Sequence, residues 1–262
     1  MIMDDIVGRT FSRVAAEKDI VSMSEMVSAA ESLSTDSRFV FRDALRKPGM
    51  SVICELKKAS PSRGTISDVY PYIELAREYE MFGASAISVL TEPYYFGGDS
   101  KHLSMVASEV KVPLLRKDFI VDEYQIYEAK VLGSSAVLLI CGLLDRDTVV
   151  RYLDIAHALG MSAIVEAHSE EEVVTAVDSG GEIIGVNNRD LRTFDVDIGN
   201  SVRLRELIPK DRIFVSESGI SNPEDIRQLR GIGTDAILVG GALMSSQNRR
   251  GTMEMLCGDP DD

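Results

Sequence analysis

Residues 51–57 read Ser-Val-Ile-Cys-Glu-Leu-Lys, a short apolar run that closes on charged residues. Similar runs, rich in β-branched residues, recur along the chain and are separated by longer stretches with helical periodicity, which is the pattern of repeated βαβ units. Eight runs are present: Ser51–Lys57, Ala84–Leu90, Val112–Arg116, Ala136–Ile140, Ser162–Glu166, Ile183–Asn187, Ile213–Glu217 and Ala236–Val239. Because they are apolar on both faces, the sheet is expected to be covered on both sides. Eight regular repeats favour an α/β fold of the (β/α)8 TIM-barrel type over a doubly wound open sheet.

Helix-like stretches lie between the runs, with local signals at their ends. Ser169 precedes three glutamates and Asn222 precedes Pro223, so a helix is expected to begin at each place. Glycines 83, 133, 160 and 180 fall where helices are expected to end. The predicted helices are Tyr72–Phe82, His102–Glu109, Glu123–Leu132, Asp145–Leu159, Glu170–Ser179, Ile198–Leu207 and Pro223–Arg230.

The length of the chain, 262 residues, suits one domain, since a closed α/β barrel needs about 250 residues. Residues 1–49 precede the first run and contain two helix-like stretches, Asp4–Glu17 and Met23–Leu33. We therefore expect a single domain over residues 1–262, with an N-terminal helical extension over 1–49 and the barrel over 50–262.

The composition of the chain indicates which classes of binding partner and which cellular location to expect. The formal charge of −14 repels nucleic-acid backbones and anionic membrane surfaces, so neither is expected as a partner. Three widely spaced cysteines, an N-terminus without the features of a signal peptide and the absence of a long apolar stretch indicate a soluble cytoplasmic protein. Any anionic ligand must be held by local positive groups.

Polar side chains close five of the eight runs, at the barrel end where active sites of this fold are built. Taken together, they are expected to converge on one pocket in which lysines donate protons and carboxylates accept them. The three histidines lack metal-ligand spacing, and nucleotide-binding glycine motifs are absent, so neither a metal nor a cofactor is expected. The candidate catalytic residues are Glu55, Lys57, Lys117, Glu166, Asn187 and Glu217.

Glycine-containing turns follow the last two runs, at Ser218-Gly219 and at Gly240-Gly241. Barrels often bind phosphate at this place, because glycine lets backbone N–H groups approach an anion, so a phosphorylated small molecule is the expected substrate. The long connection over residues 58–68, with Ser60 and Arg63, is interpreted as a lid. The aromatic residues at 94–96 are interpreted as the wall of a ring pocket.

These motifs resemble the indole-3-glycerol phosphate synthase family, and the resemblance runs from about Asp4 to Met244. It rests on five stretches: Glu55-Leu-Lys-Lys-Ala-Ser-Pro-Ser62, Ser88-Val-Leu-Thr-Glu92, Leu115-Arg-Lys-Asp-Phe-Ile-Val121, Gly185-Val-Asn-Asn-Arg-Asp-Leu191 and Val215-Ser-Glu-Ser-Gly-Ile220. The family is a TIM barrel with an N-terminal helical segment. It converts 1-(2-carboxyphenylamino)-1-deoxyribulose 5-phosphate to indole-3-glycerol phosphate, carbon dioxide and water without a cofactor, and its unfused members are often monomeric.

The resemblance also implies roles for individual residues. Lys117 would be the general acid of ring closure, Glu166 would assist dehydration, and Lys57 would contact the substrate carboxylate or donate the second proton. Orientation and binding of substrate hydroxyls would fall to Glu55, Asn187 and Glu217. The implied substrate-binding residues are Ser60, Ser218, Gly219, Gly240 and Gly241 for the phosphate, Phe96, Phe119 and Leu138 for the ring, and Arg189 for the carboxylate end.

The chain departs from the family pattern at two positions, and two other functions are also considered. Gly241 and Asp99 each stand where many members have serine. Phosphoribosylanthranilate isomerase, another phosphate-binding barrel enzyme, needs a cysteine and an aspartate as its acid–base pair, whereas Cys54 alternates out of phase with Glu55 and Lys57. A non-catalytic barrel would have lost an acid or a base, and none is missing.

Overall fold

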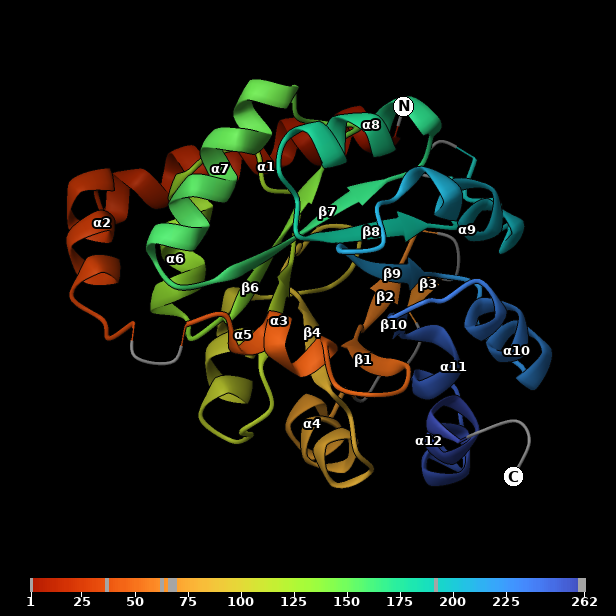
Figure 1. The fold of residues 1–262 in the computed structure, drawn as a ribbon. Helices are drawn as coiled ribbons and strands as arrows, with labels where there is room; N and C mark the ends of the chain where they lie inside the picture. The colour runs from red at the N-terminus through yellow and green to blue at the C-terminus, as the bar shows by residue number, and fades with distance from the viewer. Residues whose placement is uncertain (1, 36–37, 62–63, 66–69, 191–192, 259–262) are drawn as a thin grey trace.

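The computed structural model describes residues 2–35, 38–61, 64–65, 70–190 and 193–258. Eight parallel strands form a closed barrel in the order β1-β10-β9-β8-β7-β6-β5-β4 (Figure 1). This confirms the predicted (β/α)8 barrel, and each predicted run overlaps one strand. The strands are β1 (Ser51–Leu56), β4 (Ala86–Leu90), β5 (Leu114–Lys117), β6 (Ala136–Ile140), β7 (Ser162–Ala167), β8 (Ile183–Asn187), β9 (Ile213–Glu217) and β10 (Ala236–Val239).

Helices surround the barrel, as in Figure 1, and short helices follow its last strand. Those between the strands are α4 (Tyr72–Met81), α5 (Ser100–Ala107), α6 (Tyr124–Val131), α7 (Arg146–Ala158), α8 (Glu170–Asp178), α9 (Gly199–Leu204) with the 3-10 turn η1 (Arg205–Leu207), and α10 (Pro223–Gly231). The last strand leads into α11 (Gly241–Met244) and α12 (Arg249–Cys257).

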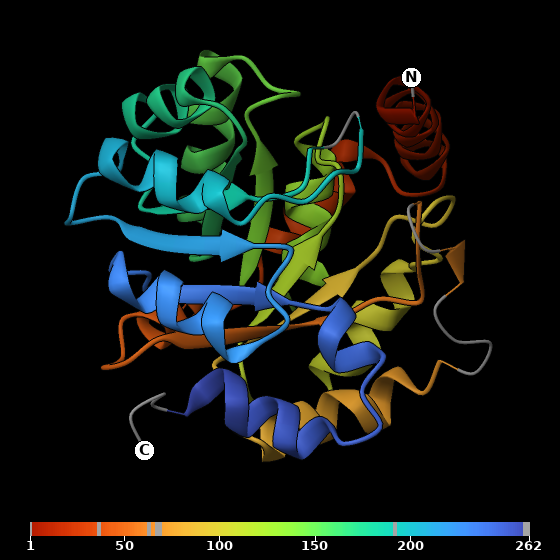
Figure 2. The same cartoon turned by 90° about the vertical axis from the view of Figure 1, so that its right-hand side faces the viewer.

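The N-terminal extension has three helices in the described residues, where two stretches were predicted. They are α1 (Ile2–Ile20), α2 (Met23–Glu31) and α3 (Val40–Leu45). The third was missed because six residues give too short a pattern to recognise. In both views α1 lies at the top of the molecule and α12 at the bottom, so the first and last helices lie on opposite sides (Figure 2).

Capping residues set the helix boundaries where the sequence indicated. Ser169 accepts a hydrogen bond from the Glu172 backbone N–H at the start of α8, and Asn222 caps α10 ahead of Pro223. The predicted start of α5 at His102 is wrong, because Asp99 caps the helix by accepting from the Lys101 backbone N–H at 2.8 Å. The departure at Asp99 thus has a structural reason, since aspartate and serine are both favoured N-caps.

Side chains alternate along each strand between the interior of the barrel and the layer beneath the helices. On β1, Ile53 belongs to the interior cluster, whereas Val52 and Cys54 pack in the outer layer. Phe41 and Leu45 of α3 join the interior cluster. No helix in the described part of the chain is long and apolar enough to cross a bilayer.

The predicted lid is described only at residues 58–61 and 64–65, and Arg63 lies outside the described residues. Its described part contains two short strands, β2 (Ala59–Ser60) and β3 (Gly64–Thr65), which pair with each other in antiparallel fashion. Two residues per strand give no periodic pattern, so this pairing was not expected.

Candidate active site

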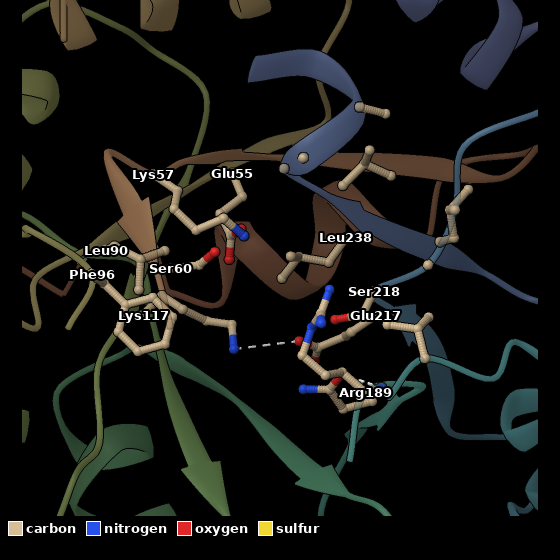
Figure 3. Close-up of a pocket in the computed structure, with 18 of the residues that line it drawn as sticks. Glu55, Lys57, Ser60, Leu90, Phe96, Lys117, Arg189, Glu217, Ser218 and Leu238 are labelled. Atoms are coloured by element: carbon tan, nitrogen blue, oxygen red, sulfur yellow. Dashed lines mark hydrogen bonds and ion pairs between the residues drawn. The ribbon is translucent and has the colours of Figure 1, made fainter. Parts of the chain in front are cut away.

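A cavity of about 670 Å³ opens at the carboxyl ends of the barrel strands. Figure 3 shows the side chains of Lys57 and Lys117 entering the same space, with Glu55 and Glu217 facing them. The structure brings all the predicted site residues to this cavity. They are Glu55, Lys57, Ser60, Phe96, Lys117, Phe119, Leu138, Glu166, Asn187, Arg189, Glu217, Ser218, Gly219, Gly240 and Gly241.

Lys117, the last residue of β5, reaches two carboxylates from other strands. Its Nζ lies 3.1 Å from Oε2 of Glu166 on β7 and 3.5 Å from Oε2 of Glu217 on β9. Both carboxylates are 1% exposed, and both oxygens of Glu217 are buried without a hydrogen-bond partner among the described residues. The ammonium is therefore the positive centre of a buried group of charges.

The protonation of this group follows from burial and charge. Burial alone would lower the pKa of Lys117, but the neighbouring carboxylates, chiefly Glu166 and Glu217, outweigh it and hold the pKa above its usual value. Burial raises the pKa of Glu217 to about 8, against the opposing charge of Lys117. Burial also acts to raise the pKa of Glu166, yet the Lys117 ammonium prevails and holds it below its usual value. Near neutral pH the site contains an ammonium, a carboxylate and a largely protonated carboxyl group.

The second ammonium belongs to Lys57, the residue that directly follows β1. Lys57 forms an ion pair with Glu55, whose side chain is buried. The two residues share a face of the strand, as their spacing predicted, and that face is opposite to Cys54. The Sγ of Cys54 packs instead against Sδ of Met253 at 3.4 Å, away from the cavity. A cysteine acid or base on this strand is thereby excluded.

Asn187 and Arg189 close β8 at the cavity. The backbone N–H of Arg189 donates to Oδ1 of Asn187 at 3.0 Å, and Nη1 of Arg189 donates to the Phe194 carbonyl at 2.8 Å. These bonds fix the turn after the strand. They place a positive guanidinium at the cavity wall, where an anionic substrate group can meet it.

The turns after β9 and β10, predicted to bind phosphate, both line the cavity. Ser218 and Gly219 both have left-handed backbones, with φ of 68° and 84°, and the Ser218 carbonyl accepts from Nδ2 of Asn188 at 3.0 Å. Gly241 begins the short helix α11. Serine is rarely left-handed, so the surrounding structure holds this turn in place.

The apolar wall of the cavity includes Phe96, Phe119 and Leu138, as predicted. The rings of Phe96 and Phe119 have centroids 6.0 Å apart and tilt by 41°. An aromatic group fits such a wall through edge and offset contacts.

Sequence reasoning missed several residues that line the cavity. Leu90 and Ile140 are the last residues of β4 and β6, and Leu238 is the last but one of β10; a search for charged residues at strand ends passes over these apolar side chains. Ser245 and Ser246 lie after α11, beyond the last predicted strand. The alternation of side chains along each strand could have predicted that these apolar residues face the interior of the barrel. In the described residues, no His, Cys, Asp and Glu side chains are grouped as metal ligands.

The fold and the site define a (β/α)8-barrel enzyme with acid–base groups at the carboxyl ends of its strands. The indole-3-glycerol phosphate synthase family model matches residues 3–256. The chain is 53% identical to indole-3-glycerol phosphate synthase of Ruminiclostridium cellulolyticum, over 94% of this chain and 95% of that protein, and 52% identical to that of Endomicrobium trichonymphae, over 95% and 96%. The chain belongs to the indole-3-glycerol phosphate synthase family, whose members are carboxy-lyases of tryptophan biosynthesis.

Solved structures of lower identity share the fold. 3-Hexulose-6-phosphate synthase from Salmonella typhimurium superposes with a TM-score of 0.64 at 14% identity, over 79% of this chain and 97% of that chain. Thiamine phosphate pyrophosphorylase from Pyrococcus furiosus gives 0.57 at 19% identity, over 79% and 93%. At these identities the similarity is one of fold.

Proposed function

We propose that this chain converts 1-(2-carboxyphenylamino)-1-deoxyribulose 5-phosphate to indole-3-glycerol phosphate, with release of carbon dioxide and water. Family membership supports this activity. The observation that carries the proposal is the Lys117 ammonium, held 3.1 Å from Glu166 in the cavity that it shares with Lys57. The rival isomerase chemistry is not favoured, because Cys54 faces away from that cavity.

In the proposed reaction, Lys117 is the general acid of ring closure. A ring carbon attacks the ketone carbon of the ribulose part, and the new carbon–carbon bond pushes the carbonyl electrons onto oxygen, which takes a proton from Lys117. The raised pKa keeps this ammonium protonated at neutral pH. The electrons of the bond to the carboxylate then return to the ring as carbon dioxide leaves.

Dehydration completes the indole. The hydroxyl group formed in the first step leaves as water after it takes a proton, and a base removes a proton from the ring system as the double bond forms. Glu166 is the proposed base, since its lowered pKa keeps it ionised. Lys57 lies on the same cavity and either donates the second proton or contacts the substrate carboxylate.

The remaining residues have proposed roles in binding. Glu55, Asn187 and Glu217 orient the lysines and bind hydroxyl groups, and Arg189 lies at the carboxylate end. The phosphate is proposed to bind at Ser60, Ser218, Gly219, Gly240 and Gly241, and the aromatic ring at Phe96, Phe119 and Leu138. Local positive charge from Lys57, Lys117 and Arg189 favours an anionic substrate in a chain of net charge −14.

We also propose that the enzyme acts in the cytoplasm as a monomer. The free cysteines Cys54, Cys141 and Cys257 suit a reducing compartment. Light scattering coupled to size-exclusion chromatography measures the oligomeric state, and a stable dimer would contradict this part of the proposal.

A direct assay tests the function. The purified protein is mixed with the anthranilate-derived ribulose phosphate, and the indole fluorescence of the product is recorded together with released carbon dioxide. We expect both signals to rise in equal amounts, without added metal or cofactor. A folded protein that consumes no substrate, or that isomerises it without loss of carbon dioxide, would contradict the proposal.

A further inference from the structure

Glu92 is a completely buried carboxylate, 0% exposed, that lies two residues beyond the end of β4. It does not line the cavity, so it has no direct contact with a bound substrate. Burial of a carboxylate is costly unless hydrogen-bond donors replace water. The donors around Glu92 therefore indicate what this residue does.

Three successive backbone N–H groups donate to the Glu92 side chain. Tyr94 donates to Oε1 at 2.9 Å, while Tyr95 and Phe96 donate to Oε2 at 2.7 and 3.0 Å. The backbone carbonyl of Glu92 also accepts from the Gly98 N–H at 2.8 Å. The loop after β4 thus folds around a single carboxylate.

The tightness of this loop is visible at Gly98. A side chain there would place its Cβ 2.5 Å from the Leu90 carbonyl oxygen and 2.8 Å from that of Glu92. Real Cβ atoms essentially never come so close, so only glycine fits. The loop has no spare room in which to rearrange while Glu92 remains bonded.

Phe96 is the residue of this loop that reaches the cavity. Its N–H is held by Glu92, and its carbonyl accepts from the Ala59 N–H at 3.1 Å, so its backbone is fixed at both ends. The ring then lies 6.0 Å from that of Phe119 on the cavity wall. The position of the ring depends on the backbone that Glu92 holds.

We propose that Glu92 is a positioning residue that sets the aromatic wall for the ring of the substrate and acts through Phe96. This inference rests on the proposed function for the identity of the ring that binds. It assigns Glu92 no contact with substrate and no part in proton transfer.

Glu92→Gln tests the proposal with an almost isosteric change. A glutamine has one acceptor oxygen, so at least one of the three loop N–H groups must face a donor instead. We expect the KM for the ribulose phosphate to rise about tenfold, with a smaller change in kcat, because Lys117 and Glu166 keep their places. Binding of 2-aminobenzoate, a probe for the ring, is expected to weaken by a similar factor, while binding of inorganic phosphate is unchanged.

Glu80→Gln is the matched control. Oε1 of Glu80 accepts from the backbone N–H groups of Lys111 and Val112, at 2.6 and 3.0 Å, in the connection that leads into β5 at the opposite end of the barrel. Glu80 lies on α4, and the same substitution there also replaces a carboxylate that holds the backbone of a loop. We expect its effect to be confined to thermal stability, with KM unchanged.

A double-mutant cycle separates positioning from a general structural role. In a Phe96→Ala background, Glu92→Gln is expected to change kcat/KM by less than about twofold, because the ring through which it acts is gone. If Glu92→Gln lowers kcat/KM as much in the Phe96→Ala background as in the wild type, the proposal is overturned. It is also overturned if Glu92→Gln alone leaves KM unchanged, or if it weakens the binding of 2-aminobenzoate and of inorganic phosphate equally. Glu92→Asp, which draws the carboxylate back from the loop, replaces the glutamine variant if circular dichroism shows that the latter is unfolded.

The two probes also keep this inference distinct from the proposed function. If the wild-type protein does not turn over the ribulose phosphate, the proposed function fails. The dependence of 2-aminobenzoate binding on Glu92 and Phe96 still decides whether Glu92 positions the ring wall.

Discussion

Gly185, within β8, and Gly240, directly after β10, leave the space that two carboxylates occupy. A Cβ built on Gly185 overlaps Oε1 of Glu217, and one built on Gly240 overlaps Oε2 of Glu55. Neither Gly185 nor Gly240 has a left-handed backbone, because neither is among the glycines with positive φ. The space at Gly240 is filled by the Glu55 carboxylate, and at Gly185 by the Glu217 carboxylate together with Cγ2 of Ile164, which lies 2.8 Å from the added Cβ.

Gly185→Ala is expected to reduce activity through Glu217. The added methyl group pushes the carboxylate away from Lys117, and a displacement of this kind costs about 100-fold in kcat/KM. Steady-state kinetics on the folded variant measures the effect. Gly231→Ala is the control, because a Cβ there meets nothing within 4 Å. Full activity of the Gly185 variant would show that Glu217 need not stay where it is.

The raised pKa of Glu217 makes stability depend on pH. A carboxyl group whose pKa is higher in the folded state stabilises the fold fully below its unfolded value of 4.5, and this stabilisation is lost as pH rises through about 8. Glu217→Gln removes the dependence. We expect the variant to gain stability relative to the wild type between pH 6 and 8.5, by at most about 1.4 kcal/mol per pH unit. Urea unfolding of both proteins at pH 6 and at pH 8.5 gives the difference in their free energies of unfolding. If that difference is the same at the two pH values, the raised pKa of Glu217 is contradicted.

At the scale of elements, α1 is joined to the loop after β5 by a buried ion pair. Nη2 of Arg13 donates to both oxygens of Asp118, at 3.0 and 2.9 Å, and Nη2 of Arg116 lies 3.1 Å from Oδ2. Burial acts to raise the pKa of Asp118, but the two guanidinium groups hold it below its usual value. The N-terminal extension is thus bonded to the residue that follows Lys117.

Arg13→Met is expected to lower the free energy of unfolding by about 2–4 kcal/mol, because it removes one partner of a buried pair and keeps the other. Arg227→Met removes an exposed pair with Glu224 and is expected to cost less than about 1 kcal/mol. Chemical denaturation of both variants gives the comparison. Equal losses would mean that the pair with Asp118 does not anchor α1.

The sequence predicts elements well where local chemistry determines them. Ser169 and Asn222 mark helix starts because their side chains satisfy free N–H groups, and the structure has both caps. Prediction fails for α3 and for the pairing of β2 with β3, since these elements are too short to show a period. The loop around Glu92 was missed because its order depends on backbone donors, which leave no side-chain pattern.

At the scale of the whole molecule, closure of the barrel brings distant strand ends together. Lys117 on β5 meets Glu217 on β9, although neither strand is hydrogen-bonded to the other. The sequence predicts that polar residues at strand ends share a cavity, because the fold places all those ends on one side. It does not predict which carboxylate pairs with which lysine, since that depends on strand order and side-chain reach.

The central claim is that Lys117 supplies the proton for ring closure at this cavity. The most direct measurement is single-turnover analysis of Lys117→Ala with the anthranilate-derived ribulose phosphate, alongside binding of indole-3-glycerol phosphate to the same variant. We expect carbon dioxide release to fall at least about 1,000-fold while product binding stays within about tenfold of the wild type. Ring closure at the wild-type rate by the folded variant would contradict the claim.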